Sequence, residues 1–334
     1  MSLHLYPIPL LIALLVAHRG LRSNSLSRSG AVAAAALGYA AVANPLGVFG
    51  VCLLGFYVAG SRATKVKAAI KATYEEPDHA PAPSSSSSAT GSKPPKAGGN
   101  RSAAQVACNA LGGVLCAATW RVLYSGERGV SAWGDEGRWC VVGRYAEEDA
   151  RRWSRPLVIV AVAFWAACCG DTLGILSTRP PFLLTTLRPA PRGTNGAVSA
   201  WGTLVSLLGG VLVGGMAVAA LAVQGQFGSG GCEGVRAGEL VGVGAVSGFG
   251  GSLVDSLLGA LFQPTYYSPS RKLVVHHPPL STSSVSTKTA SEEKDDTVLL
   301  PGTALLGSLL SNNGVNVAST VVVAGVAGWY ALRS

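Results

Sequence analysis

Long apolar runs without Lys or Arg constrain this chain more than any other feature. The two clearest are residues 197–223 and 238–262. A helix needs about 20 mostly apolar residues to cross the hydrocarbon core of a bilayer, which is roughly 30 Å thick. Hydrophobic residues make up 49% of the chain and charged residues only 13%, which is more apolar surface than a soluble fold can bury. The pattern therefore predicts a polytopic integral membrane protein.

Six further apolar runs are shorter or less regular. They cover residues 2–17, 30–43, 46–60, 102–123, 156–170 and 314–332. With the two long runs they predict an all-α transmembrane helical bundle of about eight spans, within a range of about six to nine, forming a single domain over residues 1–334. The apolar segment 298–310 is predicted to be a re-entrant or interfacial piece, and a broken helix near residues 300–313 is one form that it could take.

The distribution of Lys and Arg predicts the orientation, because basic loops resist translocation across the membrane. Basic residues without matching acids occupy residues 19–28, residues 62–71 with Lys93, Lys96 and Arg101, and residues 179–192. With eight spans these loops share the cytoplasmic side, and both termini are lumenal. No basic segment precedes the first apolar run, so we expect a retained anchor rather than a cleaved signal. The expected location is the endoplasmic reticulum or another internal membrane, and import into a mitochondrion or plastid stays open.

Two segments have the composition of disordered loops. Residues 77–99 combine a serine run with prolines, and residues 278–296 are rich in Ser and Thr. Neither segment can bury enough apolar surface to fold alone, so both are predicted to be disordered cytoplasmic loop insertions. We expect the basic residues near Lys65 to contact anionic lipid headgroups, and we expect no nucleic-acid partner.

Glycines and cysteines add two expectations about packing. Glycines four residues apart, at 210/214, 238/242 and 244/248, let helix backbones approach closely. Packing inside one bundle is the favoured interpretation, and a homodimer through these faces is the alternative. The seven cysteines form no CxxC pair, so a structural metal site is not expected. Only Cys140 and Cys232 fall in predicted lumenal loops, where a disulfide between them could form.

Five polar clusters lie at the ends of predicted spans, beside glycines. Polar side chains at membrane depth are candidate functional residues because burying them in lipid is costly. The clusters are Asn100-Arg101 with Gln105 and Asn109; Gly170-Asp171-Thr172; Arg192-Gly193-Thr194-Asn195; Gly251-Ser252 with Asp255, Ser256 and Gln263; and Asn312-Asn313 with Asn316 and Ser319. All five face the cytoplasm in the predicted topology.

The chemistry of these clusters favours phosphate and magnesium. Carboxylates beside Asn and Ser suit Mg²⁺, which prefers hard oxygen ligands and shares them with phosphates. Lys65, Arg101 and Arg192 could pair with phosphate oxygens, and the glycine before Asp171 and those around Thr194-Asn195 could expose backbone N–H groups to an anion. The chain has no GxxxxGK[ST] motif and no proper GxGxxG motif, which excludes a soluble P-loop kinase or a Rossmann enzyme.

The order of several segments resembles one integral membrane family. The segments are SRATKVKA, GNRSAAQVACNA, CGDTLGILS, LRPAPRGTNGAVSAWG, GSLVDSLLGALFQ and LLSNNGVNVAS. The family includes animal transmembrane protein nineteen and the plant phytyl-phosphate kinase of vitamin E synthesis, and the similarity runs from about residue 20 to the C-terminus. Family membership transfers a fold more securely than a function.

For the plant branch, the resemblance implies phosphoryl transfer from a nucleoside triphosphate, preferably CTP, to an isoprenoid monophosphate. Gly170-Asp171 matches a Gly-Asp pair in the nucleotide site of the distantly similar dolichol and phytol kinases. On this hypothesis Asp171 and Asp255 are catalytic and hold Mg²⁺, Lys65, Arg101 and Arg192 neutralise the transferred group, and Asn195 and Asn316 position its oxygens. Further expected phosphate-binding residues are Asn109, Gly193, Thr194, Ser252 and Asn312.

One departure from the family and two rival interpretations stay open. About four residues that the family carries after Asp-Thr, including a Glu, are missing after Leu173, roughly one helical turn. The alternative function is a membrane transporter or lipid-handling protein without catalytic activity, and Thr194-Asn195 could instead be a plain turn between spans. A scaffold protein would leave the five polar clusters unexplained.

Overall fold

Eight α-helices account for most of the part of the chain that the structure describes. The structure is a computed structural model that describes residues 5–71, 100–124, 139–174, 181–227, 232, 237–275 and 296–333. The helices are α1 (Pro7–Arg22), α2 (Arg28–Val42), α3 (Val48–Lys71), α4 (Ala103–Tyr124), α5 (Ser154–Gly174), α6 (Ala200–Val223), α7 (Ala237–Phe262) and α8 (Asn312–Arg333). Each lies on one of the eight predicted spans, which confirms the predicted helical bundle.

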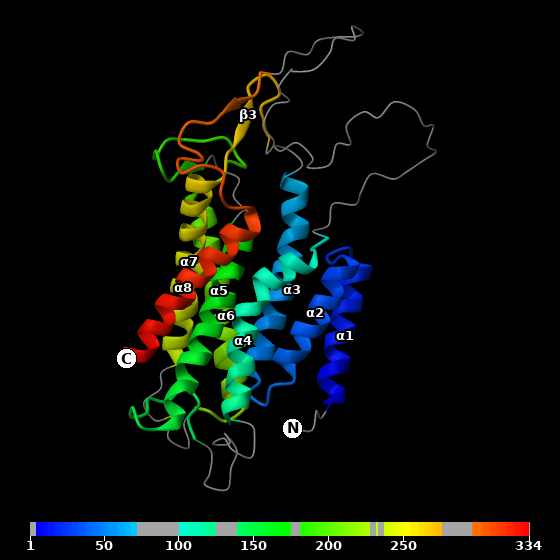
Figure 1. The fold of residues 1–334 in the computed structure, drawn as a ribbon, viewed down its shortest axis with the longest axis vertical. Helices are drawn as coiled ribbons and strands as arrows, with labels where there is room; N and C mark the ends of the chain where they lie inside the picture. The colour runs from blue at the N-terminus through cyan, green and yellow to red at the C-terminus, as the bar shows by residue number, and fades with distance from the viewer. Residues whose placement is uncertain are drawn as a thin grey trace.

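Five of these helices are long and apolar enough to cross a membrane alone. They are α4, α5, α6, α7 and α8, and a shorter apolar helix covers Val48–Thr64 within α3. Helices α1 and α2 have 16 and 15 residues. Figure 1 shows the helices running roughly along one direction, with both chain termini at the same end of the bundle. This arrangement agrees with the predicted topology.

Local sequence signals begin and end several helices. Ser27 caps α2 by accepting a hydrogen bond from the Gly30 N–H at 3.0 Å, and Ser199 caps α6 by accepting one from the Gly202 N–H at 3.1 Å. Such side-chain caps satisfy backbone donors that the first turn of a helix leaves unpaired. Helix α2 stops just before Asn44-Pro45, because a residue that precedes proline is disfavoured in the helical conformation.

Helix α5 is the centre of the bundle. Its apolar window is 72% buried inside the protein, against 28–44% for the other four long spans. Glycines let its neighbours approach it and one another: a Cβ on Gly170 would lie 2.3 Å from the Gly248 carbonyl oxygen, and one on Gly210 would lie 2.1 Å from that of Gly244. The glycines at 210, 214, 244 and 248 therefore pack inside the bundle. A Cβ at Gly238 or Gly242 would meet no atom within 4 Å.

A disulfide joins Cys140 to Cys232 near the starts of α5 and α7. It lies at the end of the bundle that carries both termini, the side predicted to be lumenal. The sequence-based pairing is confirmed, and its position agrees with the oxidising compartments in which disulfides form.

A cap of short strands and turns covers the opposite end. Strands β1 (Phe182–Leu183) and β2 (Ala197–Val198) pair antiparallel, and a three-stranded sheet has the order β4 (Leu273–Val275), β3 (Tyr266–Ser268), β5 (Val298–Leu299). We define the cap as the described residues 181–199, 264–275 and 296–311.

The prediction of a broken helix near residues 300–313 is wrong, and the re-entrant or interfacial placement of residues 298–310 stays a prediction. Residues 298–299 form β5 and the chain then runs in turns up to α8. Pro301 opens this stretch, and Gly302 and Gly307 take positive φ angles of 88° and 90°, which interrupt a helix. The predicted disordered insertion 77–99, and residues 278–295 of the second one, lie outside the described residues.

Candidate functional site

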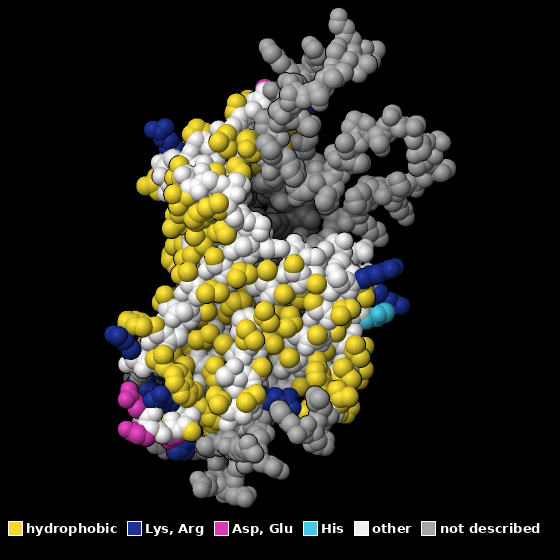
Figure 2. All heavy atoms as spheres, viewed as in Figure 1, with side chains coloured by type: hydrophobic (Ala, Val, Ile, Leu, Met, Phe, Trp, Pro, Cys, Tyr) yellow, Lys and Arg dark blue, Asp and Glu magenta, His cyan; other side chains and the backbone are white. Residues whose placement is uncertain are grey.

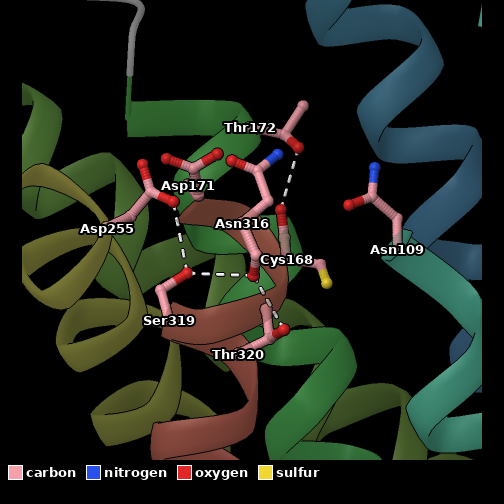
Figure 3. Close-up of a pocket in the computed structure, with 8 residues that line it drawn as sticks. All are labelled: Asn109, Cys168, Asp171, Thr172, Asp255, Asn316, Ser319 and Thr320. Carbon is pink, nitrogen blue, oxygen red and sulfur yellow. Dashed lines mark hydrogen bonds between the residues drawn. The ribbon is translucent and has the colours of Figure 1, made fainter. Parts of the chain in front are cut away.

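A pocket between four helices gathers polar side chains near the end of the bundle that bears the cap. It encloses about 200 Å³, counting the part that is open to solvent. Figure 3 shows its lining, which comes from α4, α5, α7 and α8: Asn109, Cys168, Asp171, Thr172, Asp255, Asn316, Ser319 and Thr320. Four of the five predicted polar clusters, far apart in sequence, each contribute at least one of these residues.

Asp255 on α7 is held by side chains from α8. The Ser319 hydroxyl donates to Asp255 Oδ1 at 3.2 Å and also lies 3.0 Å from the Asn316 carbonyl oxygen. In the amide orientation that satisfies both of its ends, Asn316 donates to Asp255 Oδ1 at 3.2 Å and to the Asn312 carbonyl oxygen at 3.1 Å. Two neutral donors on one helix therefore orient this carboxylate.

Asp171 on α5 faces the same pocket as Asp255 (Figure 3). Its neighbour Thr172 donates to the Cys168 carbonyl oxygen at 2.8 Å, so this hydroxyl stays bonded to its own helix. Close backbone contact brings the two carboxylate-bearing helices together, because Gly170 packs on Gly248 and a Cβ on Gly251 would lie 2.6 Å from the Ala167 side chain. Larger residues at these glycines would push α5 and α7 apart.

Arg101 lies beside the pocket, next to Thr172. Its Nη2 donates to the Thr64 hydroxyl at 2.9 Å and to the Gly60 carbonyl oxygen at 3.3 Å. A Cβ on Gly60 would lie 3.5 Å from Arg101 Nη2 and 3.6 Å from Thr172 Cγ2, so the guanidinium and Thr172 flank the same point of α3. Burial lowers the pKa of Arg101 from its ordinary value, and an arginine nevertheless stays charged.

The turn between α1 and α2 fixes the backbone of Arg101. The Ser27 N–H donates to the Arg101 carbonyl oxygen at 3.0 Å, and the Arg101 N–H donates to the Ser25 carbonyl oxygen at 3.1 Å. Leu26 and Arg101 form an isolated parallel bridge. The turn between α1 and α2 thus positions Arg101 beside the pocket, although neither helix contributes a side chain to the pocket lining.

The Thr194-Asn195 cluster lies in the cap instead of the pocket. The Thr194 hydroxyl donates to the Pro191 carbonyl oxygen at 2.7 Å. The Asn195 N–H donates to the Thr265 hydroxyl at 3.0 Å, and its side-chain amide donates to the Pro264 carbonyl oxygen at 3.2 Å. These bonds hold the segment against the end of α7. The arrangement agrees with the alternative interpretation that Thr194-Asn195 is a turn between spans.

The other predicted residues do not line the pocket. Arg192 and Gly193 belong to the cap, Ser252 is half-buried on α7, and Asn312 is the first residue of α8. Lys65 lies on α3, and its side chain falls outside the described residues.

Several residues of the site escaped sequence reasoning. Cys168 and Thr320 line the pocket, and Gly60 and Thr64 hold Arg101. Thr320 could have been found by spacing, since it lies four residues after Asn316 on the same helical face. Cys168 carried no signal apart from its position one turn before Asp171.

The donor set of the pocket fits Mg²⁺ shared with a phosphate. Asp171, Asp255, Asn316 and Ser319 all offer oxygen ligands. Among the described residues no group of three or more His, Cys, Asp or Glu side chains could hold a metal ion. Magnesium is usually bound by one or two carboxylates plus substrate phosphates. The pocket is therefore suited to an ion that is shared with a phosphate.

Comparison with known proteins identifies relatives of the whole chain. The family described as "Integral membrane protein DUF92" matches residues 11–324. Over 326 residues, covering 93% of this chain and 91% of the relative, the chain is 26% identical to "Protein PGR" of Arabidopsis thaliana. Over 102 residues, covering 29% of this chain and 37% of the relative, it is 37% identical to an uncharacterized membrane protein of Methanocaldococcus jannaschii. No solved structure matches the chain significantly.

Proposed function

The chain belongs to the DUF92 family of integral membrane proteins, and from this premise we propose that it is a multi-pass membrane kinase that phosphorylates an isoprenoid monophosphate. In the proposed reaction the bond between the β- and γ-phosphates of CTP breaks and a new bond joins the γ-phosphorus to an oxygen of the lipid phosphate. The products are CDP and an isoprenoid diphosphate, so atoms and charge balance.

One observation carries the proposal: two carboxylates from different helices meet in a polar pocket that has a half-buried cation beside it. Asp171 and Asp255 face the pocket, and Arg101 contacts α3 at the point where Thr172 also contacts it. Phosphoryl transfer needs little covalent chemistry from a protein and depends on positioning and on stabilising charge. Carboxylates for a metal and an arginine for phosphate oxygens are the parts that such a reaction requires.

The residues in and beside the pocket have different roles in the proposed reaction. Asp171 and Asp255 would hold Mg²⁺ on the nucleotide phosphates, and the ion when bound would neutralise charge on the phosphate oxygens. Ser319 and Asn316 orient Asp255 through their hydrogen bonds. Arg101 would bind oxygens of the transferred group, since its backbone is fixed by Ser25 and Ser27. A lipid phosphate is already a competent nucleophile, so a strong general base is not needed.

The depth of the pocket fits a lipid acceptor. Asp255 lies seven residues before the end of α7 at Phe262, roughly 10 Å along the helix axis. The carboxylate therefore lies within the span, where a phosphate on a membrane-embedded tail could reach it from the bilayer. A nucleotide from the aqueous phase and a phosphate from the membrane could therefore meet at the same carboxylates.

The test is phosphoryl transfer from radiolabelled CTP to phytyl, farnesyl and geranylgeranyl monophosphate in membranes that contain the full chain. Asp171→Asn and Asp255→Asn should each abolish the labelled diphosphate. Asp149→Asn is the matched control, because Asp149 is a carboxylate at the opposite end of the bundle that caps a short helix. We expect its activity to equal that of the unchanged protein.

The phosphoryl-transfer assay, together with a flux assay, separates the kinase from the transporter alternative. A transporter would give no labelled diphosphate with any acceptor, while flux of a phosphorylated lipid or solute across proteoliposomes would depend on Asp171. Labelled product that persists in both pocket variants would contradict the assignment of the site, even if the protein is a kinase.

A further inference from the structure

The cap exposes an apolar surface that no described part of the chain covers, and we propose that this surface lies in the headgroup layer of an anionic membrane leaflet. The partner is the lipid surface itself, recognised by leucine side chains and exposed cations. This inference does not rest on the proposed kinase activity.

Large apolar side chains are exposed in three parts of the cap. They come from the β1 hairpin, from β5 and from the segment before α8: Phe182, Leu187, Val298, Leu299, Leu305, Leu306 and Leu309. Leu187 and Leu309 are the most exposed, at 76% and 74% of their surfaces. Fully burying a leucine gains about 1.5–3 kcal/mol, so a cap surrounded by water would forgo most of that gain at several positions.

The cap also exposes cations. Arg188 adjoins Leu187, and Arg271 and Lys272 form the turn between β3 and β4. Among the described cap residues Asp296 is the single acidic residue. Its carboxylate accepts hydrogen bonds from the Ser268 hydroxyl at 2.6 Å and from the Ser270 N–H at 2.7 Å. Leucines beside Lys and Arg are typical of surfaces that insert into the boundary of an anionic leaflet.

The apolar surface is continuous with the part of the protein that lies in lipid. The Leu306 N–H donates to the Leu261 carbonyl oxygen at the end of α7 at 2.9 Å, and Leu309 lies three residues before α8. Figure 2 shows hydrophobic side chains extending from the helices over the cap on the same face of the molecule. A leaflet that surrounds the helices therefore reaches the cap as well.

These observations favour lipid over a second copy of the chain. Two caps brought face to face would bring both copies of Arg188, Arg271 and Lys272 into one interface, where like charges repel. Anionic headgroups complement the same cations and leave the leucines to contact acyl chains.

The test places an environment-sensitive bimane label on Leu306→Cys and Leu309→Cys in the full chain, reconstituted in vesicles of phosphatidylcholine with or without phosphatidylserine. Lipids brominated on their acyl chains quench a label that touches them, and iodide quenches one in water. Pro269→Cys, an exposed position in the turn between β3 and β4, is the aqueous control. The unchanged chain, labelled in parallel, corrects for its own cysteines.

We expect brominated lipid to quench the labels at 306 and 309 at least about twofold more than the label at 269, and phosphatidylserine to increase this difference. Arg271→Gln with Lys272→Gln should remove the increase due to phosphatidylserine. Iodide quenching at 306 and 309 equal to that at 269 would overturn the proposal. Protection from both quenchers that disappears when the protein is diluted with lipid would overturn it in favour of a second copy.

Discussion

Ser319 Oγ on α8 donates a hydrogen bond of 3.2 Å to Asp255 Oδ1 on α7. The bond joins the last helix of the bundle to a carboxylate that faces Asp171 across the pocket. Because Asn316 on α8 can donate to the same oxygen, the position of α8 determines how Asp255 is oriented. A change on α8 should therefore alter chemistry that the carboxylates of α5 and α7 support.

Removing the Ser319 hydroxyl should slow catalysis without preventing folding. Ser319→Ala deletes one hydrogen bond of about 0.5–1.5 kcal/mol, so we expect kcat to fall about two- to tenfold while the thermal midpoint changes little. Ser206→Ala on α6 is the control, because Ser206 is also buried and donates within its own helix to the Gly202 carbonyl oxygen. Equal losses of kcat in both variants would show that Ser319 has only a structural role.

Displacing the backbone of Arg101 should weaken nucleotide binding. A Cβ on Gly30 would lie 2.0 Å from the Arg101 carbonyl oxygen, so Gly30→Ala must shift the turn that holds this arginine. We expect KM for CTP to rise about three- to tenfold and kcat to fall as well, because Arg101 would bind oxygens of the transferred group while the pocket carboxylates are untouched. Steady-state transfer assays measure both constants.

The control for this prediction lies on the same helix. A Cβ on Gly38 would be 3.8 Å from the Ala13 side chain, an ordinary contact, so Gly38→Ala should leave KM unchanged and stabilise α2 by about 0.5–1 kcal/mol. A rise in KM for Gly38→Ala as large as that for Gly30→Ala would contradict the role of the turn.

Hydropathy predicted all eight helices because each helix contains an apolar run. The cap escaped prediction for a physical reason: its strands have two or three residues, too few to show an alternating pattern. The apolar residues 298–310 therefore resembled a membrane segment. In the folded chain their backbone pairs with β3 and with the end of α7.

The sequence also predicted that the polar clusters share one end of the bundle. Each span crosses the membrane once, so the number of spans between two clusters decides whether they lie on the same side. The sequence could not show which cluster lines the pocket. Asn195 and Asn316 had equal standing as candidates, yet Asn195 bonds to the Pro264–Thr265 segment and Asn316 faces Asp255. That difference depends on the packing of distant helices, which no local pattern reports.

Loss of the Cys140–Cys232 disulfide should destabilise the protein and leave the pocket intact. The bond closes a long loop, with a sequence separation of 92 residues, and both cysteines are buried. The double variant Cys140→Ser/Cys232→Ser should lower the free energy of unfolding by about 2–5 kcal/mol, seen as a lower thermal midpoint in detergent. Cys116→Ser, at a free and half-buried cysteine, is the control.

Activity distinguishes this effect from damage to the site. The disulfide and the pocket lie at opposite ends of the bundle, so the folded fraction of the double variant should transfer phosphate at the unchanged rate. A thermal midpoint equal to that of the parent would show that the disulfide contributes nothing measurable.

Substitution of Gly248 should disrupt the bundle because two backbones meet there. A Cβ at this position would lie 2.6 Å from the Ser206 carbonyl oxygen and 2.7 Å from the Gly210 Cα, and neither atom can move without displacing α6. We expect Gly248→Ala to lower stability by about 1–3 kcal/mol and Gly248→Leu to yield little monodisperse protein. Size-exclusion profiles and thermal midpoints measure both effects.

Gly242 on the same helix provides the comparison. An added Cβ there meets no atom within 4 Å, so Gly242→Ala should be neutral or stabilise α7 by about 0.5–1 kcal/mol. If the chain forms a homodimer through the face of α7 that carries Gly238 and Gly242, Gly242→Leu should convert the dimer to a folded monomer. Gly248→Leu should instead prevent the protein from folding. Equal loss of folded protein in Gly242→Leu would show that this face of α7 packs inside the protein, contrary to the arrangement described.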